Sequence, residues 1–346
     1  MSPSNTSSRY PSPSKLGKFD LISKLTANFP LHHPTSIQGI GDDAAVIDAG
    51  THYKLATTDI LAERVHFDLT YHPLKHLGYK AVTLAVSNIV AMYGMPEQIL
   101  VNMAINDNVS LPMLQELYEG IHKACTSYQV DLVGGDTTVS ATGLMITVTA
   151  LGSVDKQHIC FRKGAQVNDI ICVTGDLGTA YLGLQVLNRE KQVWEADPNM
   201  QPVLEPYSYM VRRQLKPEAR IDIVQTLQKL PVLPTCMIDV ADGLCSELLH
   251  ISKAANVGVA IYEDKLPIDQ GAYETAVAFH LDPITCAVNG GEDYELLFTI
   301  GQQDVDKVTQ HPDITPIGYV TAVAEGVRLV TKTGTVVPLK AQGWQT

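Results

Sequence analysis

The sequence has little positive charge and no apolar run long enough to cross a membrane. Its 346 residues include 25 Lys and Arg against 37 Asp and Glu, a formal net charge of −12. A general nucleic-acid binder needs a basic face, so this balance argues against that class. The best apolar candidate, Val82–Met92, contains Thr83, Ser87 and Asn88 and is far shorter than the ~20 residues of a membrane span. Small phosphate ligands are still compatible, because carboxylates hold phosphate through Mg²⁺.

Cysteines with the spacing of a metal or redox site are also absent. The six cysteines include no C-x-x-C pair, and a chain of this length needs no disulfide staples. We therefore expect reduced thiols in a cytoplasmic protein. The first residues, MSPSNTSSRYPSPS, lack the apolar stretch of a signal peptide, and we expect a disordered tail over residues 1–14.

Charged residues make up only 18% of the chain, below the usual value of about 25%, while 45% are hydrophobic. This composition excludes a disordered chain, a collagen-like chain and a highly charged coiled coil. The length favours two domains, since one domain usually has about 100–200 residues. A polar stretch at Asp155–Val167 predicts the boundary, which gives domains over residues 15–154 and 155–346.

Hydrophobic periodicity predicts strands and helices in both halves, as in α/β and α+β folds. Leu16, Phe19, Ile22, Leu25 and Phe29 have the spacing of a first amphipathic helix. Residues 191–206, rich in Gln, Pro and Glu, are expected to form an insertion loop. Further helices are expected over Leu74–Tyr93, over Pro112–Tyr128, after Gly178 and after Asp242, and strands over Ala44–Ile47, Tyr53–Thr58, Val130–Val133, Leu144–Val154, Asp169–Val173, Cys236–Val240, Val257–Tyr262, Tyr294–Ile300 and Thr315–Val320.

Acidic residues gather where predicted strands end or turn. The five segments are Ile40–Asp43, Thr57–Asp59, Gly134–Thr138, Ile238–Gly243 and Asn289–Glu295. Converging carboxylates repel one another unless cations are present, and Mg²⁺ bridges carboxylates to phosphates. The pattern therefore indicates a multi-Mg²⁺ site for a polyphosphate such as ATP. Ordinary turn residues and helix caps are the alternative for any one segment.

Several known signatures can be set aside. A P-loop sequence and the kinase H-R-D signature are absent. Gly39–Ala44 fits G-x-G-x-x-A, but a strand-like run follows where a dinucleotide-binding fold needs a helix. His72 and His76 are four residues apart, and we interpret them as a solvated helix start. Arg162 precedes Lys163 beside the predicted boundary, and the pair is either a phosphate contact or a solvated surface pair.

The ordered set of motifs resembles thiamine-monophosphate kinases, within the superfamily of aminoimidazole-ribotide (AIR) synthetase-like ATP-binding enzymes. The resemblance covers the chain from about residue 17 to its end. The matching segments are GIGDDAAV (39–46), TTD with HF (57–59 and 66–67), YKAV (79–82), GGDTT (134–138), IDVADGL (238–244), NGGEDYELLF (289–298) and QGW (342–344).

This resemblance implies a two-domain AIR synthetase-like (PurM-like) fold, with an N-terminal sheet forming a homodimer interface and an active site between the domains. The implied reaction is ATP + thiamine monophosphate → ADP + thiamine diphosphate. Several Mg²⁺ ions, held by Asp43, Asp59, Asp136 and Asp239 among others, would offset phosphate charge, with no acid–base residue. The implied contacts are Asp43, Thr57, Thr58, Asp59, Asn88, Asp136, Asp239 and Asp242 for metal, Tyr118, Gly135, Asp136, Arg162 and Ala241 for ATP, and His66, Glu292 and Trp344 for the thiamine phosphate.

Two positions depart from the family pattern. Asn88 stands where the family has a metal-bridging Asp, and Ala241 stands where it has Ser. A neutral amide binds Mg²⁺ more weakly than a carboxylate, so we expect this chain to need more Mg²⁺ than its relatives. The open alternatives are an impaired relative that binds nucleotide or thiamine phosphates, another AIR synthetase-like ligase, and a metal-dependent phosphohydrolase.

Overall fold

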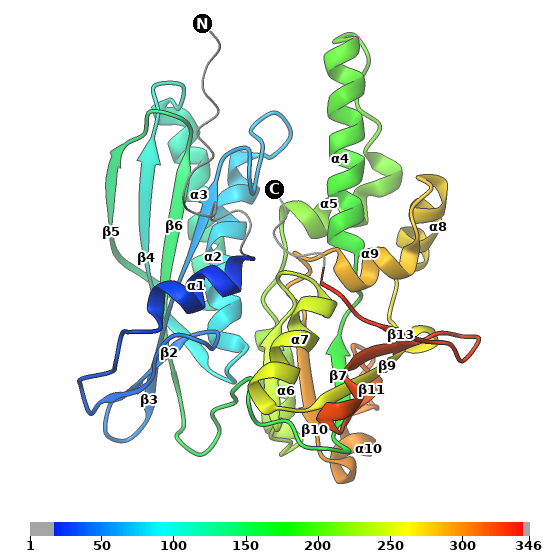
Figure 1. The fold of residues 1–346 in the computed structure, drawn as a ribbon. Helices are drawn as coiled ribbons and strands as arrows, with labels where there is room; N and C mark the ends of the chain where they lie inside the picture. The colour runs from blue at the N-terminus through cyan, green and yellow to red at the C-terminus, as the bar shows by residue number, and fades with distance from the viewer. Residues whose placement is uncertain (1–16, 342–346) are drawn as a thin grey trace, which may run out of the picture.

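The computed structural model describes residues 17–341, which form two β-sheets with helices packed against them (Figure 1). The predicted disordered tail and Trp344 lie outside the described residues. Within the described part, no helix is long and apolar enough to cross a membrane. All six cysteines are free thiols, five of them buried and Cys125 half-buried.

The first sheet has six strands in the order β1-β2-β3-β6-β4-β5. Its pairings are antiparallel except for the parallel β4–β5 pair. Buried and half-exposed residues alternate along β6, the pattern of a strand with one covered face. The strands are β1 (Ser36–Gln38), β2 (Ala45–Asp48), β3 (Tyr53–Ala62), β4 (Met95–Ile105), β5 (Asp131–Val139) and β6 (Met145–Val154).

Helix α2 (Leu74–Val90) covers one face of this sheet and packs against α3 (Leu111–Tyr128). The two helices approach closely because glycines stand at their contact. A Cβ on Gly78 would lie 2.0 Å from the Leu117 carbonyl oxygen, and one on Gly120 would lie 1.9 Å from the Lys75 carbonyl oxygen. Helix α2 also contacts elements of the second half of the chain, so it lies between the two sheets.

The second sheet has seven strands in the order β13-β12-β9-β11-β7-β10-β8, with β12 and β9 parallel. The three strands at one end of this order, β7, β10 and β8, are almost wholly buried. The strands are β7 (Ile170–Thr174), β8 (Cys236–Asp239), β9 (Gly258–Tyr262), β10 (Leu296–Ile300), β11 (Ile314–Thr321), β12 (Val327–Val330) and β13 (Val336–Pro338). The helices of this half are α4 (Thr179–Ala196), α5 (Ser208–Leu215), α6 (Ile221–Lys229), α7 (Leu244–Ala255), α8 (Gln270–Ala278), α9 (Pro283–Asn289) and α10 (Val305–Val308).

One apolar cluster joins the two sheets. It includes Val86 and Ile89 of α2 together with Ile223 of α6, Met237 of β8 and Phe298 of β10. The two halves of the chain therefore share part of their core.

Two strands are longer than the sequence predicted. β3 continues to Ala62 because it pairs with β6 over ten residues, which places Thr57–Asp59 inside the strand. β5 continues to Val139 along β4, which places Gly134–Thr138 inside it as well. The prediction that both acidic segments stand at strand ends is therefore wrong. Partner strands, which the local sequence does not reveal, set these lengths.

Other expectations also need correction. Residues 191–196 belong to α4, so the expected insertion loop begins only after Ala196. The first helix, α1 (Lys18–Thr26), ends before Phe29 and has no buried residue. The acidic segment Asn289–Glu295 begins at the last residue of α9 and leads into β10, so it follows a helix and not a strand end. Strand β4, which the sequence analysis missed, lies between β6 and the edge strand β5 of the first sheet.

His72 is buried and is not part of a solvated helix start. Burial and the charge of Lys80 lower the pKa of its imidazole to about 3. A neutral ring fits this apolar position, and among the described residues its Nε2 has no hydrogen-bond partner.

Candidate active site

Three buried or half-buried carboxylates from distant segments lie close together. Asp43 belongs to the turn before β2, Asp59 lies on the face of β3 that packs toward α2, and Asp239 ends β8 of the second sheet. Asp43 and Asp239 are 6% and 3% exposed, so neither is an ordinary surface turn residue. The structure therefore brings together three of the predicted metal positions.

Helix α2 connects these carboxylates. The Ser87 hydroxyl donates to Asp239 Oδ2 at 2.6 Å, and the Asn88 side-chain amide donates to Asp59 Oδ2 at 2.6 Å. Consecutive residues of one helix thus contact a carboxylate from each sheet. Asn88 points into the site, where it acts as a hydrogen-bond donor.

Two cations of the chain also reach the acidic groups. Arg162 pairs with Asp43, its Nε lying 3.2 Å from Oδ2, so it is not a solvated surface residue. Lys18 at the start of α1 places its Nζ 3.1 Å from Asp242 Oδ2. Both members of the Lys18 pair are more than 40% exposed, so that pair contributes little to stability.

Burial and repulsion from neighbouring carboxylates raise the pKa values of the acidic residues in this cluster. Burial, followed by the charge of Asp43, raises the pKa of Asp239 to about 7. Burial raises the pKa of Asp59 to about 6, although Lys18 and Asn88 act in the opposite direction. Burial and Asp43 also raise the pKa of Asp42 to about 6. The cluster therefore carries negative charge that the protein's own cations offset only in part.

This donor set fits a magnesium site that includes phosphate. Within residues 17–341, no three His, Cys, Asp or Glu side chains are grouped so that they could hold one ion by themselves. Mg²⁺ typically takes one or two carboxylates and completes its shell with water and substrate phosphates. The cluster can offer one or two negatively charged carboxylates to each ion, which is the number that Mg²⁺ typically takes.

A cavity of about 880 Å³ lies beside the cluster and contains two of the predicted substrate residues, His66 and Glu292. Burial lowers the pKa of His66, whose Nδ1 accepts a hydrogen bond from the Ala62 backbone at 3.0 Å. The cavity is lined by Glu63, Arg64, Val65, His66, Phe67, Asp68, Leu69, Thr70, Tyr71, Tyr181, Leu184, Asn188, Lys191, Gln214, Gly290, Gly291 and Glu292.

Three residues that were predicted to bind the nucleotide lie away from the carboxylate cluster. Gly135 and Asp136 are on β5, which β6 and β4 separate from β3, so about 14 Å divides them from Asp59. Tyr118 of α3 is 37% exposed and lines a different cavity of about 730 Å³ beside β5. Strand alternation also places Thr58 on the opposite face of the sheet from Thr57 and Asp59.

Ala241 contributes its backbone, since its carbonyl oxygen accepts a hydrogen bond from the Glu292 amide at 2.7 Å. Sequence reasoning missed three polar residues of this region: Lys80, Ser87 and Gln214. Lys80 and Ser87 were recognisable as polar residues seven apart on the apolar stripe of a predicted helix. Gln214 had no sequence signal, because α5 was not predicted.

The family comparison agrees with this architecture. Residues 41–154 match the model of the AIR synthase related protein, N-terminal domain. The hydrogenase maturation protein HypE of Escherichia coli shares the fold with a TM-score of 0.67 at 18% identity, covering 83% of this chain and 85% of that chain. The chain therefore has an AIR synthase-like fold, which confirms the expected fold class.

More similar relatives narrow the assignment. The thiamine-monophosphate kinase of Bacillus subtilis (strain 168) is 32% identical over 95% of this chain and 99% of its own length. That of Escherichia coli (strain K12) is 31% identical over 95% and 97%. The structure of AaThiL complexed with AMPPCP and TMP aligns with a TM-score of 0.82 at 29% identity, over 97% of this chain and 99% of that chain. The chain belongs to the thiamine-monophosphate kinase family.

The raised pKa values predict how stability changes with pH in the metal-free protein. The pKa of Asp239 is 3.8 in the unfolded chain and about 7 in the folded protein. Between these two pH values the folded protein keeps a proton on Asp239 that the unfolded chain has released. The free energy of unfolding should therefore fall as pH rises through this window. Between about pH 5 and about pH 8, the free energy of unfolding of Asp239→Asn should fall by about 2–3 kcal/mol less than that of the wild type.

Urea unfolding in EDTA, followed by circular dichroism, measures this difference. Asp107→Asn, at an exposed turn position, is the control and should keep the wild-type pH dependence. If the free energy of unfolding changed with pH equally in wild type and Asp239→Asn, this result would contradict an uncompensated buried charge at Asp239.

Proposed function

We propose that this chain transfers the terminal phosphoryl group of ATP to thiamine monophosphate, forming thiamine diphosphate and ADP. One observation carries the proposal: α2 connects the buried carboxylates to the cavity that contains His66 and Glu292. Homologues over nearly the full chain are thiamine-monophosphate kinases, and the similar AaThiL structure contains AMPPCP and TMP.

The chemistry needs charge compensation more than it needs a base. A phosphate monoester has a second pKa near ~6, so the acceptor phosphate is largely dianionic at neutral pH. The barrier comes mainly from repulsion between two anions and from their alignment. Bound Mg²⁺ would supply positive charge between the two phosphates. Asp43, Asp59 and Asp239 would orient that charge, and Arg162 would remain available for a phosphate oxygen.

The remaining site assignments follow the family pattern. We assign Thr57, Thr58, Asn88, Asp136 and Asp242 to the metal ions. Tyr118, Gly135, Asp136, Arg162 and Ala241 are assigned to ATP, and His66, Glu292 and Trp344 to the thiamine phosphate.

We also propose a homodimer formed through the first sheet. Thr58 and Ile60 lie on the face of β3 that points away from α2, and Ile60 is 54% exposed. Every residue of the edge strand β5 is exposed, including the apolar Val133 and Val139. A second copy against this face would cover the apolar residues. It would also bring a second β5, with its Asp136, toward a site that the chain's own Asp136 is too distant to complete.

Two further assignments remain predictions. The boundary between the halves is placed at residues 154/155, between β6 and β7. A cytoplasmic location agrees with six free thiols in one chain.

A catalytically impaired relative is the second candidate. The side-chain amide of Asn88 donates a hydrogen bond to Asp59 Oδ2. A carboxylate at position 88 would instead attract a metal ion. Such a protein would bind the same ligands without turnover.

Purified protein mixed with ATP, thiamine monophosphate and excess Mg²⁺ should form thiamine diphosphate. Chromatography measures the amount of this product over time. Product should require ATP, and Asp43→Asn should reduce kcat/KM by about 100-fold or more, since it removes a charge that orients the metal. Binding of both ligands without product over a wide Mg²⁺ range would favour the impaired relative. Phosphate release without nucleotide would indicate a phosphohydrolase.

Asn88→Asp should lower the Mg²⁺ concentration for half-maximal activity by about threefold or more, because it replaces a neutral donor with a metal-binding carboxylate. The same change should increase the rise in melting temperature that Mg²⁺ produces, a readout independent of turnover. Asn108→Asp, on an exposed turn, is the matched control. Superimposable Mg²⁺ titrations for wild type and Asn88→Asp would refute the role of Asn88.

Ile60→Arg should convert the dimer to a monomer, because it places a charge in the apolar contact. Size-exclusion chromatography with light scattering measures the mass, with Leu111→Arg as a control at an exposed apolar residue outside the sheet. A wild-type protein that is monomeric at high micromolar concentration would exclude the proposed interface.

A further inference from the structure

A buried lysine, Lys80, stands behind the cavity rather than in it. It lies in the middle of α2 and is 0% exposed. Its Nζ donates to the Gln214 carbonyl oxygen at 2.9 Å and to Glu292 Oε2 at 3.1 Å. Burying an ammonium group is costly unless it is paired, so these contacts explain how a lysine is accommodated on the buried side of this helix.

Glu292 is held from two sides. Its Oε2 accepts from Lys80 Nζ and from Gln214 Nε2, the latter at 2.6 Å. The carboxylate is 27% exposed and lines the 880 Å³ cavity. Both donors bind the same oxygen, and within residues 17–341 Oε1 accepts no hydrogen bond, so it is available for a ligand.

The backbone around Glu292 does not by itself favour this arrangement. Glu292 and Tyr294 have φ of 58° and 52°, values that side-chain-bearing residues rarely adopt, and Gly291 has φ of 74°. Contacts from elsewhere must therefore hold the segment. The Glu292 and Tyr294 amides donate to Ala241 and Val240 carbonyl oxygens at 2.7 and 2.9 Å.

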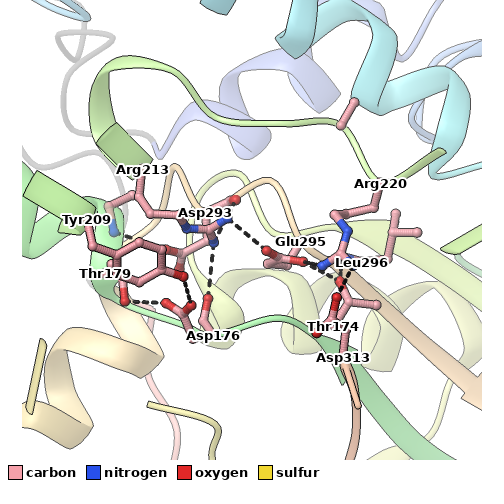
Figure 2. Close-up of polar contacts among 12 residues, drawn as sticks. Thr174, Asp176, Thr179, Tyr209, Arg213, Arg220, Asp293, Glu295, Leu296 and Asp313 are labelled. Carbon is pink, nitrogen blue, oxygen red and sulfur yellow. Dashed lines mark hydrogen bonds and ion pairs between the residues drawn. The ribbon is translucent and has the colours of Figure 1, made fainter. Parts of the chain in front are cut away.

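A second set of contacts fixes the end of the same segment (Figure 2). Arg213 pairs with Glu295 at 2.9 Å and donates to the carbonyl oxygens of Asp176 and Asp293. Arg220 pairs with the other oxygen of Glu295 at 2.6 Å. Since Gln214 follows Arg213 directly, anchoring Arg213 also anchors the side chain that holds Glu292.

Helix α2 connects this arrangement to the acidic cluster. Lys80 and Ser87 are seven residues apart, which places them on one face of the helix at about 10 Å. Lys80 contacts Glu292, while Ser87 contacts Asp239. One rigid helix thus sets the spacing between a carboxylate of the cavity and a carboxylate of the proposed metal site.

We propose that Lys80 is a positioning residue for the acceptor substrate: together with Gln214 it orients Glu292 toward the thiamine moiety and fixes its distance from the phosphoryl-transfer site. The inference rests on the proposed function. It assigns to Lys80 no contact with substrate, since its side chain is fully buried behind Glu292.

Lys80→Met keeps the length of the side chain and removes its charge. Its Kd for thiamine monophosphate, measured by calorimetry with Mg²⁺, should rise by about tenfold or more, while the Kd for AMPPCP changes by less than about twofold. In turnover, KM for thiamine monophosphate should rise without a matching rise in KM for ATP. Lys75→Met is the matched control, because Lys75 lies on the same helix but is exposed and pairs with Glu119.

A double-mutant cycle with Glu292→Gln separates positioning from general destabilisation. If Lys80 acts through Glu292, Lys80→Met should have little further effect in the Glu292→Gln background. Equal loss of affinity for both ligands, or an undiminished effect in that background, would overturn the proposal.

Gln214→Met provides a second test if Lys80→Met does not fold, because it removes one donor and leaves Lys80 paired. It should cause a smaller loss with the same selectivity for thiamine monophosphate, and unchanged affinity would overturn the proposal. Wild-type protein that binds no thiamine monophosphate would refute the proposed function and this inference together. Wild-type turnover with unaffected variants would refute the inference alone.

Discussion

Repulsion among buried carboxylates is the constraint around which this structure is arranged. Asp43, Asp59 and Asp239 come from both halves of the chain; burial raises the pKa of each, and the charge of Asp43 raises the pKa of Asp59 and Asp239 further. Each is met by a donor from elsewhere in the chain: Arg162 for Asp43, Asn88 for Asp59, and Ser87 for Asp239. The contacts of Arg162 and Ser87 join the two halves, and all three contacts leave negative charge for divalent cations to offset.

Helix α2 can carry two of these donors because it lies between the sheets. Its glycine-mediated contact with α3 and its apolar packing on the first sheet fix its position. Its polar residues then reach the second sheet, Lys80 toward Glu292 and Ser87 toward Asp239. An apolar helix that contains isolated polar residues at helical spacing is therefore informative, since each such residue needs a buried partner.

The sequence predicted the parts of the fold that depend on local pattern. Periodicity located α2 and α3, and alternation located β6. It missed β4 and α5 and ended β3 and β5 too early, because strand length depends on a partner strand far along the chain. It also misjudged His72, whose burial follows from tertiary packing around Lys80 and Leu215.

By itself, the sequence determined which residue types were available: paired acids beside glycines, and motifs in the order of one kinase family. Those features depend on covalent neighbours, so they are readable in one dimension. Only the tertiary structure decided which acids meet. It joined Asp43, Asp59 and Asp239 and placed Asp136 on β5, which two intervening strands separate from β3. It also gave Glu292 its partners Lys80 and Gln214, because contacts between residues more than 75 positions apart depend on how the sheets and helices pack.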